Sequence, residues 1–429
     1  MRNKRFEKKK IDISNKNIKL RISIFILALI IALGSFIFGI NACVNSSSPN
    51  KGWNLYNLKD YYDSRYEGYN ENVYLNYFIS DGNKSENKRI IDLLCLSAKE
   101  VYSMIDSNKN HSYEVNGIGY INSHIGENIE ICEELYKILS DAKEKTYEEN
   151  SSYSMFSGLI QDYWKSLIPN VSNSSYKEPG YIKDYVDFSK DLSNFNLDLK
   201  KKEDKYFAKF TISDKLKDFI DESNLYDVSI LDLNTLFYSY YLEGIYSRFK
   251  DNGLNKGYLY THTGEIIFMN NSFLESNGIR LYDSLSYDQP FVCGLLEMNN
   301  ASYVSSIRSF PVFSEYEKEY FFTQIPSSNN SRSMFYDYRT GYSQNVIKSS
   351  TLVDEDMSSS LVDLTFKNLN VVNSKDYNAY KGLSSSICGC LILSSETNKM
   401  YLRNAKDYFK KVYNNKGELI DYELIMILD

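Results

Sequence analysis

The chain has 429 residues, of which 43% are hydrophobic and 24% charged, with a formal net charge of −7. This length supports a full hydrophobic core of one large or two ordinary domains. The acidic balance and the presence of only three histidines argue against a nucleic-acid-binding face and a multi-histidine metal site.

The N-terminus has the charge pattern of a membrane segment. The first 21 residues hold nine Lys or Arg against Glu7 and Asp12, a net of +7, so the remainder carries −14. An uncharged apolar stretch then runs from Ile22 to Ile40 and is long enough to cross the bilayer as a helix. Because basic flanks stay in the cytoplasm, the sequence predicts that everything after Ile40 lies outside the membrane.

Two modes of anchoring remain open at the end of this stretch. Ala42 and Cys43 fit a lipoprotein signal with a lipidated Cys43, whereas Asn41 and the long basic region fit an uncleaved single-pass anchor. Both predict a bacterial cell-membrane protein with an extracytoplasmic body. The expected parts are a basic cytoplasmic tail (1–21), a transmembrane anchor or lipoprotein signal (22–43), a spacer (44–70) and one extracytoplasmic domain (71–429).

The remaining cysteines do not indicate a disulfide framework. Five follow Cys43, an odd number at irregular spacing. Cys388 and Cys390 lie two apart in an apolar run, which places them on one face of a strand. We expect them to be small buried side chains and not a metal pair.

Hydrophobic periodicity predicts a mixed α+β body. Helical spacing covers 88–105, 127–145 and 235–250, with a weaker helix at 359–370. Strands are expected at 205–212, 256–262, 265–269, 318–325, 386–394 and 422–428. The charged run 199–205 is interpreted as a solvated turn. Helices cluster early and strands late, which does not fit a regular βαβ alternation.

Four segments in a fixed order carry a resemblance to a known family. They are "SMFSGLIQDYW" (154–164) after the helix at 127–145, "LDLNTLFYSYYLEGIYSRFKDNGLNKGYLYTHTGEI" (231–266), "SMFYDYRTGYSQN" (333–345) and "DEDMSSSLVDLTF" (354–366). Together they resemble the FAD:protein FMN transferases, the ApbE family, over roughly residues 75–375. Asp337, Arg339, Thr340, Gly341 and Tyr342 match that family's Asp-Pro-Arg-Thr-Gly-Tyr stretch.

The resemblance implies a fold, an activity and ligands. The fold would be the ApbE-like, T-fold-like body with mixed and antiparallel sheets and flanking helices. The activity would be Mg²⁺-dependent transfer of FMN from FAD to a Ser or Thr of an acceptor flavoprotein. FAD would therefore be a substrate, Mg²⁺ a cofactor, and the acceptor and the membrane the partners.

Site residues follow from the matched segments. The resemblance implies a flavin-nucleotide pocket and a shifted Mg²⁺ site. No catalytic residue is assigned. The pocket would be lined by Asp232, Thr235, Gly264, Glu265, Asp337, Arg339, Thr340 and Gly341, and the metal would be held by Asp356, Ser360 and Asp363. The run "DEDMSSS" equally fits an ordinary acidic helix N-terminus.

Several site positions depart from the family pattern. Asn234 and Thr235 stand where the family has two glycines, and their side chains would fill space near a ligand. Tyr238 replaces a Lys, and Met334 replaces a His that serves the reaction. These changes leave a second hypothesis, a catalytically inert relative that binds flavin or a partner protein. No Asp-Gly-Ala-Thr-like stretch indicates that the chain is itself an FMN acceptor.

Overall fold

The structure is a computed structural model. It describes residues 51–61, 72–82, 84–111, 115–168, 182–270, 278–298, 300–312, 317, 320–324, 331–374, 377–396, 398–411 and 422–427. The apolar stretch 22–40 and Cys43 lie outside these ranges, as does part of the expected strand at 318–325. Within these ranges, no helix combines the length and apolarity that crossing a membrane requires.

The chain divides into two units. The smaller one comprises residues 1–52 and 79–87, of which the structure describes only the ends of two strands and the first turn of helix α2 (Lys84–Ile105). The larger one comprises residues 53–78 and 88–429 and contains the candidate site.

The larger unit is built on a nine-stranded sheet. Its pairs from β2–β6 to β14–β15 are antiparallel, and β15–β17 is parallel. In spatial order the strands are β1 (Gly52–Asn57), β2 (Tyr74–Ile79), β6 (Gly257–Tyr260), β7 (Glu265–Phe268), β10 (Tyr303–Arg308), β13 (Ile347–Asp354), β14 (Ile387–Leu393), β15 (Lys399–Arg403) and β17 (Glu423–Ile427).

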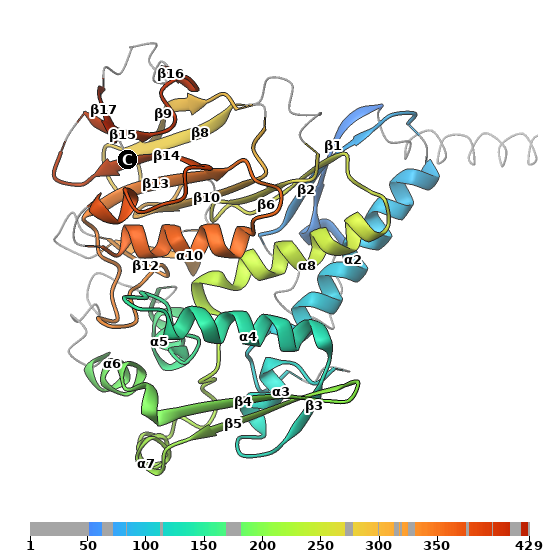
Figure 1. Cartoon of the computed structure of the whole chain (residues 1–429), viewed down its shortest axis with the longest axis vertical. Helices are drawn as coiled ribbons and strands as arrows, with labels where there is room; N and C mark the ends of the chain where they lie inside the picture. The colour runs from blue at the N-terminus through green and yellow to red at the C-terminus, as the bar shows by residue number, and fades with distance from the viewer. Residues whose placement is uncertain are drawn as a thin grey trace, which may run out of the picture. The chain divides into compact units, whose positions relative to one another are not determined.

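Both faces of this sheet are covered (Figure 1). Helices α8 (Phe237–Asp251) and α10 (Leu361–Val372) pack on one face. A three-stranded sheet of β8 (Ile279–Ser284), β9 (Pro290–Leu296) and β16 (Phe409–Lys411) packs on the other through a shared apolar cluster. Cys388 and Cys390 are buried in that cluster, which confirms their predicted role. Burial raises the pKa of Cys388 to about 11, so its thiol stays protonated.

The region between the first helices and α8 forms a further layer. Helix α4 (Glu133–Tyr147) packs on the antiparallel sheet β3–β5–β4, whose strands are Ile129–Ile131, Lys205–Ile212 and Phe195–Lys202. The other elements are α3 (Ile118–Ser123), α5 (Gly158–Leu167), α6 (Lys183–Lys190), α7 (Asp214–Ser223), β11 (Phe322–Gln324), β12 (Ser331–Ser333) and the 3₁₀ helices Leu58–Tyr61, Leu192–Asn194, Asn234–Leu236 and Tyr377–Tyr380.

Two sequence-based boundaries are wrong. The helix expected at 127–145 starts only at Glu133, because Ile129 and Ile131 alternate inward as strand β3 and pair with β5. Cys132 then ends the strand and caps helix α4, since its sulfur accepts from the Leu135 N–H. The charged run 199–205 is not simply a turn. Strand β4 continues to Lys202, and Glu203 makes the turn at φ +54°.

The start of helix α5 is held against residues 229–232. Gly158 N–H donates to the Ile230 carbonyl, and Asp232 N–H donates to the Met155 carbonyl. A Cβ at Gly158 would lie 2.0 Å from the Ser229 carbonyl oxygen, so only glycine allows this approach. The first two motif segments therefore meet through their backbones, and this contact brings α5 to the start of α8.

Candidate functional site

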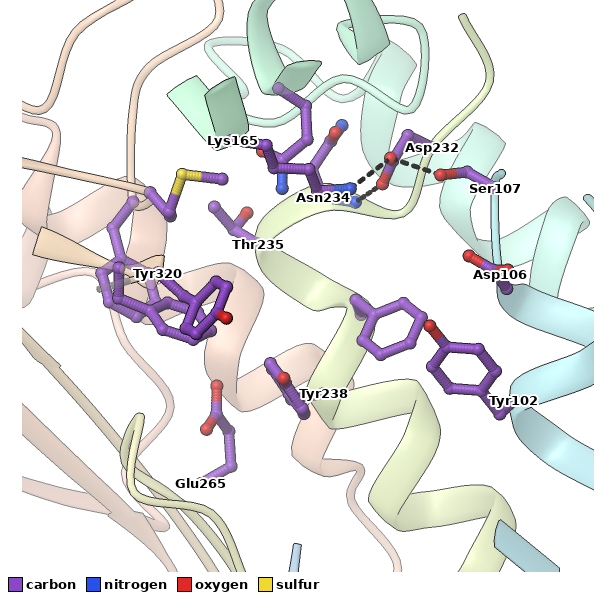
Figure 2. Close-up of a pocket in the computed structure, with 15 residues that line it drawn as sticks. Tyr102, Asp106, Ser107, Lys165, Asp232, Asn234, Thr235, Tyr238, Glu265 and Tyr320 are labelled. Carbon is purple, nitrogen blue, oxygen red and sulfur yellow. Dashed lines mark hydrogen bonds and ion pairs between the residues drawn. The ribbon is translucent and has the colours of Figure 1, made fainter. Parts of the chain in front are cut away.

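A cavity of about 340 Å³ opens where helix α8 begins (Figure 2). Its wall combines the end of α2, helix α5, the residues before α8, strand β7 and residues 320–321 and 334–335. The lining residues are Tyr102, Asp106, Ser107, Gln161, Lys165, Asp232, Asn234, Thr235, Phe237, Tyr238, Glu265, Tyr320, Phe321, Met334 and Phe335. Three of the predicted pocket residues, Asp232, Thr235 and Glu265, are thus brought together.

Aromatic side chains form one wall of the cavity. The rings of Tyr102 and Phe237 meet edge to face with centroids 5.7 Å apart, and those of Tyr238 and Phe321 are 5.8 Å apart. Met334, at the position of the family's His, is 4% exposed and belongs to an apolar cluster. Such a wall suits the faces of a planar ring, because aromatic groups attract one another in offset and edge-on arrangements.

The polar end is organised around the carboxylate of Asp232. Its oxygens accept from the Asn234 N–H at 2.7 Å, the Ser107 hydroxyl at 2.6 Å and the Lys165 ammonium at 3.2 Å (Figure 2). Asp232 is 5% exposed, so these donors replace the water that an ionised carboxylate needs. The carboxylate is therefore a fixed anion at the start of α8.

Asn234 shows why a glycine position accepts another residue here. Its φ is +50°, in the left-handed region that glycine adopts freely and that asparagine tolerates best among the other residues. Its Nδ2 donates to the Ser154 carbonyl at 2.8 Å and to the Ser157 hydroxyl at 3.0 Å. The side chain therefore joins this turn to the start of α5, besides lining the cavity.

Lys165 places a cation at the polar end of the cavity. Burial disfavours its ammonium, but the carboxylates of Asp232, Asp106 and Asp162 outweigh that effect and raise the pKa of Lys165. Its side chain is 54% exposed, whereas that of Asp232 is 7% exposed. The ammonium stays charged at neutral pH and remains paired with Asp232.

Asp106 and His111 form a second polar pair at the cavity. The Nδ1 atom of His111 lies 2.5 Å from Asp106 Oδ2, and the Asp106 side chain is 11% exposed. Sequence reasoning did not assign Asp106, Ser107, Gln161 or Lys165 to the site. Gln161 and Lys165 are four apart on α5, but this spacing becomes informative only once α5 is known to face α8.

Glu265 lies in the cavity wall on β7, one residue after Gly264. Burial raises the pKa of Glu265, although hydroxyl donors from Thr261 and Thr263 oppose this shift. Gly264 has φ +130°, and a Cβ there would lie 2.1 Å from the Ser306 carbonyl oxygen. The glycine thus permits the turn and the sheet contact that place Glu265, and it is not itself among the lining residues.

The Asp337–Gly341 loop lies in a different place. Asp337, Arg339 and Thr340 line a second, polar cavity. The Arg339 guanidinium donates to both Asp337 oxygens, to the Asn150 carbonyl and to the Ser152 hydroxyl. These contacts give the Asp-x-Arg pair a structural role, so its predicted contact with a flavin nucleotide stays a prediction.

Gly341 connects this loop to helix α5. Its carbonyl accepts from Trp164 Nε1 at 2.9 Å, and its φ of +78° explains the glycine. The indole of Trp164 also meets the ring of Tyr342 edge on. Two motif segments that are far apart in the sequence therefore share one buried contact.

The three candidate metal ligands have other partners. Asp356 is fully exposed and accepts from the Ser358 N–H and hydroxyl. The Asp363 carboxylate lies 2.5 Å from the ammonium of Lys145, which places a cation where a metal would need to bind. Among the residues that the structure describes, no three His, Cys, Asp or Glu side chains gather as a metal site. The contacts of Asp356 and Asp363 do not favour Mg²⁺. The assignment of Asp356, Ser360 and Asp363 as metal ligands stays a prediction.

Ser360 is the N-cap of helix α10. Its Oγ accepts from the Asp363 N–H at 3.3 Å and donates to Glu243 Oε1 at 2.8 Å. Ser360→Ala should lower the free energy of unfolding by about 1 kcal/mol, the usual cost of a lost N-cap, as measured by urea denaturation. The exposed Ser358→Ala is the matched control. Unchanged stability together with loss of Mg²⁺ binding would favour the metal role instead.

Comparison with known proteins shows a likeness in structure alone. No protein-family model matches the sequence, and no curated protein matches it. The structure resembles that of the ApbE protein from Thermotoga maritima with a TM-score of 0.54 and 14% identity, over 76% of this chain and 92% of that one.

Two further solved structures resemble the chain more weakly. The flavin transferase ApbE from Vibrio cholerae has a TM-score of 0.47 and 12% identity, over 79% of this chain and 95% of that one. The flavinyl transferase ApbE from Pseudomonas stutzeri has a TM-score of 0.48 and 10% identity, over 76% of this chain and 88% of that one. The α+β body expected from the sequence is confirmed, and the chain has the fold of the ApbE proteins.

Proposed function

We propose that this chain is a flavin-binding protein built on the flavin-transferase fold. The observation that carries the proposal is the cavity at the start of α8, which combines an aromatic wall with an ordered polar end. A ligand pocket of this kind usually has apolar walls with a few fixed polar groups. The fold is shared with a protein of the ApbE group, and two other members of that group are named flavin transferases.

A titration of the full chain in detergent tests this function. Riboflavin, FMN and FAD are added in turn, and quenching of flavin fluorescence reports binding. Thr235→Trp should weaken binding at least tenfold, because the indole would fill the cavity that Thr235 lines. Ala379→Trp, an exposed position of the second cavity, is the control and should bind as the parent does. If no flavin binds to the folded parent chain, the proposed function is wrong.

The second candidate is transfer of FMN from FAD to a hydroxyl of an acceptor flavoprotein. The Asp106 carboxylate favours it, since it lies in the cavity wall and is oriented by His111. The acceptor oxygen would bond to the FMN phosphorus, the pyrophosphate bond would break with AMP leaving, and Asp106 would take the hydroxyl proton. Release of AMP from FAD, abolished by Asp106→Asn, would establish this activity; AMP release that survives the substitution would exclude this role for Asp106.

We also propose that the protein is tethered to the membrane with its body outside the cytoplasm. The basic residues before Ile22 and the uncharged stretch to Ile40 support this placement. Residues 1–50 lie outside the described ranges, so the support comes from the sequence alone. Recovery in the membrane fraction after alkaline washing is expected, and recovery in the supernatant would contradict the tether. A lipid label that Cys43→Ser removes would identify lipidation.

A further inference from the structure

We propose that the cavity selects an uncharged flavin, chemically a riboflavin, over the anionic flavin nucleotides FMN and FAD. This inference rests on the proposed function and names the ligand class of the same cavity. Three observations support it. Nearby donors already donate to a protein carboxylate, two buried acceptor atoms lack a donor, and three carboxyl groups line the cavity.

Three donors near the start of α8 that could hold a phosphate already donate to a carboxylate of the protein. At the start of a helix, free backbone N–H groups and a nearby cation normally bind such an anion. Here the Asn234 N–H and the Lys165 ammonium both donate to the Asp232 carboxylate. The Ser107 hydroxyl donates to the same group. Asp232 thus occupies the anion position with an anion of the protein's own.

Charge in the described lining also opposes a phosphate. Three lining residues carry carboxyl groups, Asp106, Asp232 and Glu265, and Lys165 carries the one ammonium among the fifteen described lining residues. Asp106 faces His111, and Glu265 is held by threonine hydroxyls. An FMN phosphate, with about −1.5 to −2 charge near neutral pH, would meet like charges in a partly enclosed space where repulsion is weakly screened.

Two side chains of the cavity lining each carry a buried acceptor atom without a donor. Asn234 Oδ1 and Gln161 Oε1 have no hydrogen-bond partner within the described residues. Asn234 is 6% exposed and Gln161 is 7% exposed. Flipping the Asn234 amide would break two hydrogen bonds, because its Nδ2 donates to the Ser154 carbonyl and the Ser157 hydroxyl. A buried acceptor without a donor is costly, so the polar end calls for a ligand with N–H or O–H groups.

An uncharged flavin meets these requirements. Its ring carries an imide N–H, and its ribityl chain carries hydroxyls, so it offers donors without a phosphate. Its planar ring suits the wall formed by Tyr238 and Phe321. The volume of about 340 Å³ also lies near the lower limit of about 300 Å³ for ligand pockets, which favours a compact ligand over a dinucleotide.

Competition among the three flavins tests the inference on the full chain in detergent. Riboflavin is expected to bind at least tenfold more tightly than FMN or FAD. Asp232→Asn should reduce that ratio, because it removes a negative charge and frees the Lys165 ammonium for a phosphate. Equal or tighter binding of FMN or FAD to the parent chain would overturn the inference and leave the proposed function standing. Absence of binding by all three would overturn both.

A second variant tests the open acceptors separately. Gln161→Leu keeps a similar shape but removes Oε1, and it should weaken riboflavin binding about fivefold to tenfold. Gln324→Leu, an exposed glutamine on β11 outside the cavity, is the matched control. Circular dichroism confirms that both variants fold. Unchanged riboflavin affinity in folded Gln161→Leu would contradict the assigned role of this acceptor.

Discussion

Replacing Arg308 by methionine is expected to destabilise the folded chain by about 3 to 5 kcal/mol, the cost of breaking a buried ion pair by removing one partner. The side chains of Arg308 and Glu317 are 1% and 0% exposed, and they meet at 2.7 Å. Glu317 also accepts from the Val312 N–H, and Arg308 donates to the His262 carbonyl. Methionine would leave a buried carboxylate without its cation.

Urea denaturation followed by circular dichroism measures this loss. Arg280→Met, at an exposed position on strand β8, is the matched control and should change the free energy of unfolding by less than about 0.5 kcal/mol. Equal stability of the two variants would show that the Arg308–Glu317 pair is not buried as the structure has it.

Trp164→Ala is the second large effect, with an expected loss of about 3 to 5 kcal/mol for truncating a fully buried aromatic side chain. Trp164 is 0% exposed and packs with Ile160, Val186 and Met334. Its Nε1 donor would also be lost from the Gly341 carbonyl. Since α5 also carries Gln161 and Lys165, which line the cavity, flavin binding should weaken in parallel.

The chain has only two tryptophans, and this gives the experiment its control. Trp53 is 39% exposed, so Trp53→Ala should retain nearly full stability and a blue-shifted indole emission from Trp164. Trp164→Ala should retain only the emission of a solvated indole. A destabilisation below about 1 kcal/mol, well under the usual cost of a buried aromatic truncation, would contradict the assigned contact between the two motif segments.

Much of the fold could be predicted because its long elements have clear periodicity. Helices α2, α8 and α10 and strands β5, β6, β7, β14 and β17 lie at or within a few residues of the predicted ranges. Strand β3 was taken for helix because Ile129-Glu130-Ile131 is too short to show alternation. Apart from the charged run 199–205, the regions 165–205 and 270–315 received no assignment, although they hold α6, β4, β8, β9 and β10. Strands β4 and β8 form hairpins with β5 and β9. Strands β9 and β10 also pair with the distant strands β16 and β13, which local patterns do not reveal.

The site could be predicted only where motif residues line the cavity directly. Asp232, Thr235 and Glu265 do so, whereas Asp337 and Arg339 stabilise a loop next to another cavity. Matching the family motifs by spacing does not distinguish residues that line the cavity from residues that stabilise a loop, because both groups keep the residue types of the motifs. The polar side chains of α5, Gln161 and Lys165, depend on a backbone contact between residues 158 and 230 that the sequence does not show.

The predicted clash at Asn234 has a physical resolution. Sequence reasoning expected its side chain to fill the ligand's space, but the left-handed backbone directs its Nδ2 toward Ser154 and Ser157. Its Oδ1 is buried and has no donor among the described residues. We therefore expect Asn234, at a position where the family has glycine, to favour a ligand that donates a hydrogen bond over one that carries a phosphate.

A crystal structure of the full chain grown with riboflavin tests the central claim most directly. The account predicts the flavin ring against Tyr238 and Phe321 in the cavity at the start of α8, with a ligand donor within hydrogen-bonding distance of Asn234 Oδ1. A flavin bound instead at the polar cavity beside Arg339 would contradict this account.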